Sequence, residues 1–419
     1  MRPGAAWVTA ENPMRHSFLS VLGLALIVRV AWALAVPVQP VSDSHVYDLL
    51  ARHLADGLGF CFLPGQPTAL WPVGTSFLYS LFYRLFGVSY VPIVVFNLFL
   101  SLVSLWLLML LAERWFGRHL ALVAGYLTAL WPVQIEFTTV LASELIFNFL
   151  MLALLFLWES SRINPWLKAV LVGLLSAAAV YIRPVAFFFP LLLCIPGVFR
   201  SRRIFQPIGS MLLAFAILAA AIAPWSLRNL HTLGRLVPMS TNGGEDIWMG
   251  NNPTGPGKAQ YLPPNALAMP EAARDIYLAN LGKAYIRRHP GRFLVRSLHK
   301  TVWLYDHETI GVHWNPAIQS RYGSRVFWLL KLASDLYWWA ALALACGGLV
   351  LLLIRRGLGV LLTFPPLVFL MYFTALYSAI LATDRYHYGC LPFLAMFAAY
   401  TLCAMRKRAA EPVPQPAAH

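Results

Sequence analysis

The sequence has few charged residues and few cysteines. Only 12% of its 419 residues are Asp, Glu, Lys or Arg, whereas 59% are hydrophobic. Soluble domains carry about 25% charged and about 45–50% apolar residues, so too few charges remain here to cover a water-soluble globule. The five cysteines form no Cys-x-x-Cys pair and no Cys/His cluster, which argues against a disulfide-rich secreted scaffold and a zinc site. The composition predicts a polytopic membrane protein.

Acidic residues are scarcer than basic ones. The chain has 17 Asp and Glu against 32 Lys and Arg, a formal net charge of +15. In a membrane protein, Lys and Arg gather in cytoplasmic loops and beside anionic lipid headgroups. We therefore expect membrane lipids as partners and no nucleic acid.

The long apolar runs are continuous and do not alternate, which indicates helices and excludes barrel strands. The sequence predicts a single membrane domain over residues 1–405 with about ten transmembrane helices. Residues 406–419 form a cytoplasmic tail that is rich in Pro and Ala and expected to be disordered. The expected spans are 17–36, 91–112, 119–135, 144–159, 168–182, 184–199, 207–227, 326–354, 358–381 and 389–405.

The distribution of Lys and Arg sets the orientation. Every second loop is basic, which places both termini in the cytoplasm and leaves two large outer segments, about 37–90 and 228–325. Residues 73–86 are too short for an ordinary crossing of about 20 residues, so we expect an interfacial or partly inserted helix there. In the second outer segment, a helix is expected to begin with Pro270 at its first position and to end near Arg287, Arg288 and His289, and 292–305 is expected to lie along the membrane surface.

Polar residues recur at the outer edge of the spans. Asp43 lies a few residues beyond the first span, where either Ser42 or Asp43 can cap a helix. Asp48 lies about 140° from Asp43 around that helix, so the two are not an acid/base pair. Cations beside carboxylates at one membrane depth suit a phosphorylated ligand.

Several motifs occur in an order that resembles the GT-C superfamily of membrane glycosyltransferases. The resemblance is to the bacterial branch related to protein O-mannosyltransferases and lipid A aminoarabinose transferases (glycosyltransferase family 39). The motifs are Arg29, Ser42-Asp43-Ser44, Trp71-Pro72-Val73-Gly74, Ser143-Glu144, Pro224-Trp225, Arg228-Asn229, Gly250-Asn251-Asn252-Pro253, His289-Pro290 and Arg385-Tyr386.

The resemblance implies a GT-C-like bundle in the bacterial inner membrane, with its active site on the outer, periplasmic face. Such enzymes move a sugar from a polyprenyl phosphate to a lipid, glycan or protein acceptor. It makes Asp43 the expected general base and places Arg183 near the donor phosphate. The expected phosphate-binding residues are Arg183, Arg228 and Arg385, and the expected substrate-lining residues are His45, Tyr47, Trp71, Glu144 and Tyr386.

One departure from the family concerns metal binding. Many relatives have a Glu-Lys pair before the end of the first outer segment, where this chain has Ala69-Leu70-Trp71-Pro72. No cofactor is therefore certain, and a divalent metal stays open, with His45, Glu144 or His387 as substitute ligands.

Two other functions are open at this point. A transporter or flippase of lipid-linked sugars usually has ionisable groups near the midplane. Lys331 and Asp335, one helical turn apart, are the main candidates for such groups here and suit a simple ion pair. A non-catalytic assembly subunit would have the same apolar spans but would not need the outer-edge charges. These charges favour the transferase.

Overall fold

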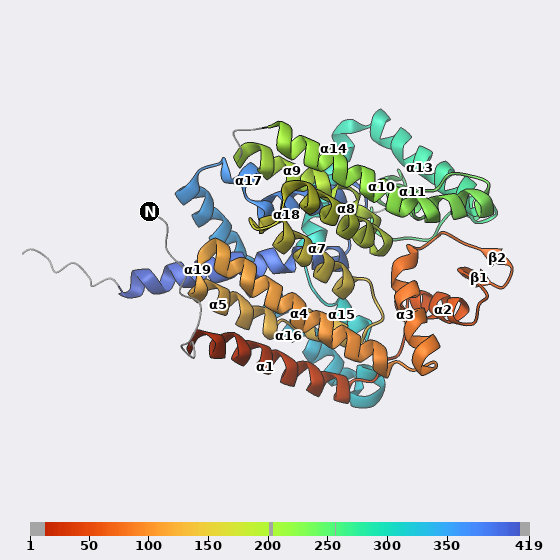
Figure 1. Ribbon diagram of the computed structural model, residues 1–419. Helices are drawn as coiled ribbons and strands as arrows, with labels where there is room; N and C mark the ends of the chain where they lie inside the picture. Colours follow the sequence, from red (N-terminus) through yellow and green to blue (C-terminus); the bar gives the residue numbers. More distant parts are fainter. Residues whose placement is uncertain (1–12, 201–203, 256, 411–419) are drawn as a thin grey trace, which may run out of the picture.

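The computed structural model describes residues 13–200, 204–255 and 257–410, which are almost entirely helical (Figure 1). The one sheet within these ranges is a hairpin of β1 (Cys61–Leu63) and β2 (Gln66–Pro67). The helices up to residue 200 are α1 (Pro13–Ala35), α2 (Asp43–Ala55), α3 (Val73–Phe86), α4 (Val91–Phe116), α5 (Arg118–Ala129), α6 (Pro132–Glu136), η1 (Phe137–Thr139), α7 (Glu144–Glu159), α8 (Pro165–Ile182), η2 (Pro184–Phe188) and α9 (Phe189–Arg200). The later helices are α10 (Phe205–Leu233), α11 (Gly243–Asn251), α12 (Pro264–Leu267), α13 (Glu271–Arg288), α14 (Pro290–Tyr305), α15 (Ile310–His313), α16 (Ala317–Arg356), α17 (Val360–Thr363), α18 (Pro365–Ala379), η3 (Asp384–Cys390) and α19 (Leu391–Ala410).

The predicted all-α, multi-pass membrane architecture is confirmed, but the count of ten spans is not. In the described ranges, six helices are long and apolar enough to cross a membrane, or seven if one bent pair counts as a span. That pair is α5 with Pro132–Thr139, which meet at 63°. Hydropathy alone does not register such a break or the shortness of helices such as α18, which explains the higher expectation.

The bundle has two distinct ends. In Figure 1, α1 begins and α19 ends at the left, whereas α2, the hairpin and α13 lie at the right. Parts of both outer segments predicted from the sequence thus lie at one end of the molecule. The helix α19 continues through Ala410, and the predicted disordered residues 411–419 lie outside the described residues.

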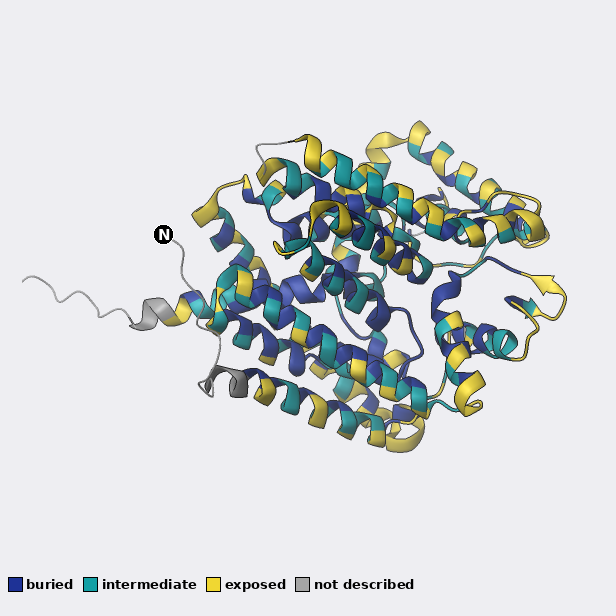
Figure 2. Ribbon diagram, viewed as in Figure 1, coloured by how far each residue is buried: buried dark blue, intermediate teal, exposed yellow. Residues whose placement is uncertain are grey.

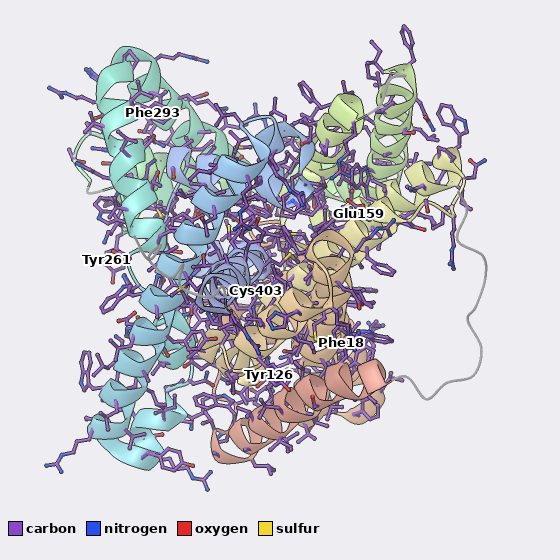
Figure 3. The ribbon with its side chains drawn as sticks, turned by 90° about the vertical axis from the view of Figure 1, so that its left-hand side faces the viewer. Phe18, Tyr126, Glu159, Tyr261, Phe293 and Cys403 are labelled. Carbon is purple, nitrogen blue, oxygen red and sulfur yellow. The ribbon has the colours of Figure 1, made fainter. Side chains whose placement is uncertain are left out.

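The helix α19 lies at the centre of the bundle. In its apolar window 72% of the residues are buried inside the protein, against 17% for α10 (Figure 2). Viewed from the end where α1 begins, Cys403 of α19 lies near the middle, whereas Phe18 and Phe293 lie on opposite sides (Figure 3). A helix that is apolar all round can face protein or lipid, so the exposed faces of α10 are consistent with contact to lipid tails.

The helix α3 has the bounds that the sequence predicts, 73–86. It lies against α8 at Gly74, where a Cβ atom would approach the carbonyl oxygen of Tyr181 to 2.6 Å. Only glycine fits at that distance, so Gly74 allows the first outer segment to pack closely on the bundle.

A buried arginine holds the bent pair of helices. The guanidinium of Arg29 in α1 donates to the carbonyl oxygens of Thr128 and Ala129 at the end of α5, at 3.2 and 2.8 Å, and to Ser101 Oγ. The last carbonyl groups of a helix lack partners within the helix and carry partial negative charge. Arg29 supplies donors to these carbonyl groups at the break.

The two outer segments are tied together by Glu271, the first residue of α13. Its carboxylate accepts hydrogen bonds from the hydroxyl of Thr68 (2.5 Å), the amide of Ala69 (2.8 Å) and the hydroxyl of Thr241 (2.7 Å). Thr68 and Ala69 follow the hairpin, and Thr241 precedes α11. Glu271 therefore fixes α11 relative to the first outer segment.

The ion pair expected between Lys331 and Asp335 does not form. Lys331 Nζ lies 3.1 Å from His313 Nε2, whereas Asp335 Oδ1 accepts the backbone amide of Glu308 at 3.0 Å. Both residues follow the helical break at Gly323, where φ is +82°. The break starts a new helix whose neighbours offer each residue a different partner.

Candidate functional site

Asp43 begins α2 immediately after a strained residue. Ser42 has φ 51° and ψ −129°, and it is the one non-glycine residue with positive φ in the described ranges. A reciprocal contact between Ser44 Oγ and the backbone of Val41 supports the turn, at 2.6 and 2.8 Å. Such backbone strain costs about 1–3 kcal/mol and is typical of functional sites. Neither Ser42 nor Asp43 makes a side-chain capping bond, so the Asp43 carboxylate projects away from its own helix end.

A chain of alternating charges connects Asp43 to the bundle. Arg385 Nη1 donates to Asp43 Oδ2 at 2.5 Å, and Arg385 Nε lies 3.4 Å from Glu144 Oε1. Arg183 Nη2 lies 3.3 Å from the same Glu144 oxygen. The structure thus brings together four residues that the sequence had predicted at one membrane depth. The first and last of them are 342 positions apart in the chain.

These four residues lie at helix ends and breaks. Asp43 and Glu144 begin α2 and α7, Arg183 separates α8 from η2, and Arg385 lies in η3. The N-terminus of a helix favours carboxylates because unpaired N–H groups point outward there. Arg183 precedes Pro184, which disfavours a continuing helix and turns the chain.

The two arginines keep hydrogen-bonding capacity. Neither contact to Glu144 Oε1 has the geometry of a hydrogen bond. Within the described residues, the side chain of Arg183 makes no hydrogen bond, and that of Arg385 makes one, to Asp43. A guanidinium has five N–H groups. Both side chains can therefore donate further hydrogen bonds, and an anion is the partner that suits them.

Aromatic rings pack against the guanidinium groups of Arg183 and Arg385. The guanidinium carbons of Arg183 and Arg385 lie 5.7 and 5.3 Å from the ring centre of Tyr386, which stacks on Tyr377 at 4.6 Å. Trp314 lies 4.9 Å from the guanidinium of Arg385. Such contacts hold an arginine in place without consuming its hydrogen-bond donors. The sequence predicted Tyr386 but gave no signal for Trp314, which lies between two helices of the second outer segment.

Tyr47 is buried in the same cluster. Desolvation raises its pKa to about 12, and the nearby charges of Asp43 and Glu144 act in the same direction. The phenol therefore remains protonated at neutral pH. Asp48, by contrast, accepts from Tyr83, Tyr90 and Arg52, which confirms that it is not a partner of Asp43.

Asp246 of α11 is a third carboxylate at the site that sequence reasoning missed. It interacts electrostatically with Arg385, Asp43 and Arg183. Among the described residues, its side chain has neither a hydrogen bond nor an ion pair. The residues around it, Gly243-Gly244-Glu245-Asp246, read as a turn in the sequence, so no helical pattern indicated that one carboxylate faces the arginines.

Arg228 of α10 binds backbone oxygens on either side of the hairpin. Its guanidinium donates to the carbonyl oxygens of Thr68 (2.7 Å) and Phe60 (3.1 Å) and lies 4.6 Å from the ring centre of Trp225. It thus anchors the hairpin to α10. Within the described residues, no hydrogen bond or ion pair links it to Arg183 or Arg385, and its predicted place at the donor phosphate stays a prediction.

Two predicted substrate-lining residues lie apart from the charge chain. Trp71 packs with Leu50, Phe60 and Val73, and its ring centre lies 6.2 Å from that of Phe62. His45 is exposed and has no hydrogen bond in the described ranges. Both residues belong to the first outer segment, but contacts with the four charged residues do not support their predicted roles.

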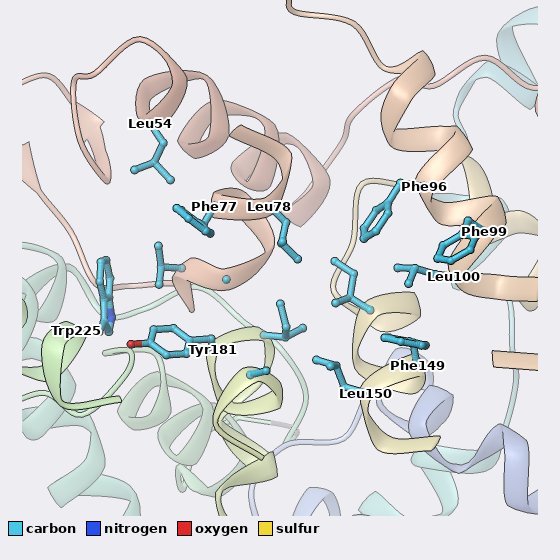
Figure 4. Close-up of a pocket in the computed structure, with 15 residues that line it drawn as sticks. Leu54, Phe77, Leu78, Phe96, Phe99, Leu100, Phe149, Leu150, Tyr181 and Trp225 are labelled. Atoms are coloured by element: carbon cyan, nitrogen blue, oxygen red, sulfur yellow. The ribbon is translucent and has the colours of Figure 1, made fainter. Parts of the chain in front are cut away.

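A large apolar cavity is lined in part by α2 and α7, which begin at Asp43 and Glu144, and by α8, which Arg183 follows (Figure 4). It has a volume of about 750 Å³ and is lined by residues of α2, α3, α4, α7, α8 and α10. Ile182, in its wall, directly precedes Arg183, and Ile146, also in its wall, lies two residues after Glu144. Trp225 and Tyr181 line one side, and Phe96 and Phe99 another. The cavity can hold a hydrocarbon chain whose polar end meets the arginines.

The residues present do not fit a metal site of ordinary composition. Across the described residues, no group of three or more His, Cys, Asp or Glu side chains is placed to hold a metal ion. Asp43 and Glu144 face arginines, which take the place that a cation would have beside them. His387, a predicted substitute ligand, faces away from this cluster, because it lies between Leu304 and Glu308.

Comparison with known proteins adds three findings. The family model described as dolichyl-phosphate-mannose-protein mannosyltransferase matches residues 71–227, which is less than half of the chain. No curated protein sequence matches. Solved membrane-protein structures do match, and they span nearly the whole chain.

Two of these structures are of the oligosaccharyltransferase of Archaeoglobus fulgidus. One is its complex with Zn and sulfate (TM-score 0.54, 13% identity, covering 93% of this chain and 49% of that one). The other is its complex with an inhibitory peptide and a dolichol-phosphate (TM-score 0.54, 13% identity, 96% and 53%). A third structure, ArnT from Cupriavidus metallidurans bound to undecaprenyl phosphate, has TM-score 0.44 and 14% identity over 97% of this chain and 82% of that one.

The chain thus spans about half the length of the oligosaccharyltransferase that it resembles. At 13% identity the similarity concerns the fold. It confirms the GT-C-like fold class that the motifs predicted.

Proposed function

We propose that the protein is a glycosyltransferase that takes a sugar from a polyprenyl-phosphate donor and passes it to a lipid, glycan or protein acceptor. Three observations support this. The chain has the fold of an oligosaccharyltransferase that has been crystallised with dolichol-phosphate. The matched family model describes an enzyme that uses dolichyl-phosphate-mannose. The third is the site itself.

One observation of the structure carries the proposal. Arg183 and Arg385, two arginines with unused hydrogen-bond donors, both lie beside Glu144, and Arg385 also pairs with the Asp43 carboxylate. Arg183 directly follows Ile182, which lies in the wall of an apolar cavity of about 750 Å³. A lipid phosphate needs both an apolar channel and fixed cations, whereas a soluble sugar phosphate needs only the cations. This combination favours a lipid-linked donor.

Asp43 is the general base in this proposal. A sugar or protein hydroxyl is a poor nucleophile at neutral pH, so a positioned carboxylate must take its proton as the new glycosidic bond forms. Asp43 uses Oδ2 to accept from Arg385, while Oδ1 makes no hydrogen bond within the described residues. Its side chain is 24% exposed, the most accessible of the four charged residues, and this suits a base that meets an incoming acceptor.

The arginines act on the leaving group. As the bond from the sugar carbon to the phosphate oxygen breaks, negative charge develops on the polyprenyl phosphate. Arg183 and Arg385 are held in place by Glu144 and Tyr386, so their N–H groups stabilise that charge without further reorganisation. The hydroxyl proton goes to Asp43, and a single displacement inverts the anomeric centre.

We place this site on the outer, periplasmic face of the inner membrane, with both termini in the cytoplasm. The pattern of basic loops supports this orientation, as does the gathering of α2, α13 and the hairpin at the end opposite the start of α1 and the end of α19 (Figure 1). The second outer segment, about 228–325, is then available to the acceptor. Exposed Leu294, Leu298 and Val302 give α14 an apolar face suited to the membrane surface.

The test is donor turnover by purified protein. The protein is offered a panel of polyprenyl-phosphate sugars and a membrane glycolipid extract, and mass spectrometry follows free polyprenyl phosphate and any acceptor that gains a sugar. We expect turnover by wild type and a loss of at least about a hundredfold in Asp43→Asn, with donor binding retained. Asp56→Asn, an exposed residue at the other end of α2, is the matched control. Equal turnover by Asp43→Asn and Asp56→Asn would remove Asp43 from the mechanism.

A further inference from the structure

Asp246 is the carboxylate at the site that the proposed mechanism does not use. It belongs to α11, in the second outer segment, and its side chain is half-buried. Asp43 is paired with Arg385, and Glu144 lies beside two arginines. Asp246 alone of the three has no hydrogen bond or ion pair, as far as the described residues show.

The packing of α11 fixes the direction of Asp246. A Cβ atom at Gly250 would lie 1.6 Å from the carbonyl oxygen of Ile380, so that face of α11 touches the end of α18. A Cβ atom at Gly282 of α13 would lie 2.7 Å from the side chain of Ile247, so the neighbouring face touches α13. Asp246 lies one turn before Gly250 and therefore on the side of α18 and η3.

Two anchors hold α11 in that orientation. Lys300 Nζ lies 3.3 Å from the Gly250 carbonyl oxygen and 2.9 Å from that of Ala379. At the other end, the amide of Gly244 donates to Asp275 Oδ1 at 2.6 Å. Asp246 is thus on a fixed helix, and its distance from the arginines is set by packing on both sides.

Charged and titratable groups from four elements face Asp246. These groups are Glu245 on its own helix, Asp43 on α2, Arg183 at the end of α8, and Arg385 and Tyr386 on η3. Glu245 itself is paired with Arg274 at 2.9 Å. Desolvation, together with the charges of Glu245 and Asp43, raises the pKa of Asp246 to about 7, against the lowering effects of Arg385 and Arg183.

The balance of charge at the site then depends on Asp246. Arg183 and Arg385 are matched by Asp43 and Glu144, so ionised Asp246 gives the empty cluster one excess negative charge. The phosphodiester of a donor would bring a second negative charge to the same two arginines. Like charges that share a site repel each other. This repulsion is relieved most readily when a proton binds to Asp246, the one carboxylate that is paired with no cation.

We propose that Asp246 couples donor binding to proton uptake, so that the lipid phosphodiester binds to the form of the site in which Asp246 is protonated. This inference rests on the proposed function. The proton comes from solvent and adds to a carboxylate oxygen of Asp246, and no bond of the donor changes in this step. The neutral carboxyl then donates a hydrogen bond towards the phosphate.

The experiment measures the affinity for a polyprenyl-phosphate sugar between pH 6 and 9. This probe is a phosphodiester, which has no protonation step of its own in that range. We expect wild type to bind about ten- to a hundredfold more weakly at pH 9 than at pH 6, since a repulsion of one to two pKa units is typical of neighbouring like charges. Calorimetry in two buffers of different ionisation enthalpy should show proton uptake near pH 8.

Two variants separate this inference from its alternatives. Asp246→Asn should bind with little pH dependence, at an affinity near that of wild type at pH 6, and without proton uptake. Glu245→Gln removes the same charge from the adjacent residue and should keep the pH dependence of wild type. Wild-type binding that is independent of pH, or a dependence that persists in Asp246→Asn, would contradict the inference while leaving the proposed function intact. Absence of binding at every pH, in all three proteins, would contradict the proposed function itself.

Discussion

The short helix η3 separates two polar clusters that differ in nearly every physical respect. On one side, Arg385 joins Asp43 and Glu144 in a partly exposed chain of charges. On the other side, His387 joins Glu308 in a cluster that is buried. The first cluster has unused hydrogen-bond donors and includes the first residues of two helices that line the cavity. The second is closed, so it can hold η3 in place but cannot meet a substrate.

The buried cluster is also neutral. His387 Nδ1 lies 2.6 Å from the carbonyl oxygen of Leu304, which can only accept, so Nδ1 carries the proton. His387 Nε2 then accepts from Glu308 at 3.1 Å, while Trp131 Nε1 donates to the other Glu308 oxygen at 2.7 Å. Burial raises the pKa of Glu308 well above its ordinary value, in agreement with a protonated carboxyl. The difference between the clusters shows that one segment can be fixed by a neutral network and present a charge on its other face.

The comparison predicts the largest effect at Arg385. Arg385→Ala should lower turnover by at least about a hundredfold, because it removes N–H groups that bind the phosphate and leaves Asp43 without its partner. Donor affinity and turnover, measured together by binding and mass spectrometry, should both fall. Arg385→Lys should recover only part of the loss, because lysine lacks the planar fork that reaches two carboxylates. Full activity of Arg385→Ala would show that η3 presents no functional group.

A smaller effect distinguishes Arg183 from Arg228. Arg183→Ala should weaken binding of the lipid-linked sugar by about tenfold or more, because the N–H groups of Arg183 are free to bind a phosphate. Arg228→Ala should leave the affinity for the lipid-linked sugar unchanged and lower the melting temperature. The reason is that the N–H groups of Arg228 bind the backbone oxygens of Thr68 and Phe60. Titration with a polyprenyl phosphate, with melting curves of the same preparations, checks both expectations. The opposite pattern would restore Arg228 as a phosphate ligand.

The smallest effect is expected in the neutral cluster. Glu308→Gln should change the free energy of unfolding by less than about 1 kcal/mol, since an amide can donate to His387 and accept from Trp131 as the protonated carboxyl does. Glu308→Ala, the comparison variant, should cost about 1–3 kcal/mol by leaving both partners unpaired in the interior. Melting temperatures between pH 6 and 9 measure the difference. A strongly destabilised Glu308→Gln would show that Glu308 is ionised.

Much of the fold was accessible from the sequence. The helix α3 was predicted with its observed bounds, 73–86, because its apolar run is bounded by Pro72 and Gly87. Span counting failed where hydropathy continues through a bend, as at Leu130 and Trp131 between α5 and α6. The Pro270 position was off by one residue, since it caps α13 instead of opening it.

The candidate site was only partly predictable. Asp43, Glu144, Arg183 and Arg385 share a membrane depth, and the structure brings them together. Arginines at one depth look alike in a sequence, so Arg228 could not be told apart until its backbone partners were known. Asp246 and Trp314 gave no pattern at all, because their places depend on how α11, and the turn between α15 and α16, pack against distant helices.

The most direct test is a structure of the protein with a polyprenyl phosphate bound. Our account predicts the phosphate within hydrogen-bond distance of both Arg183 and Arg385, with the prenyl chain in the cavity lined by Tyr181, Trp225 and Phe99 (Figure 4). A phosphate held elsewhere, at Arg228 or on the basic surface of α13, or a chain outside this cavity, would contradict it.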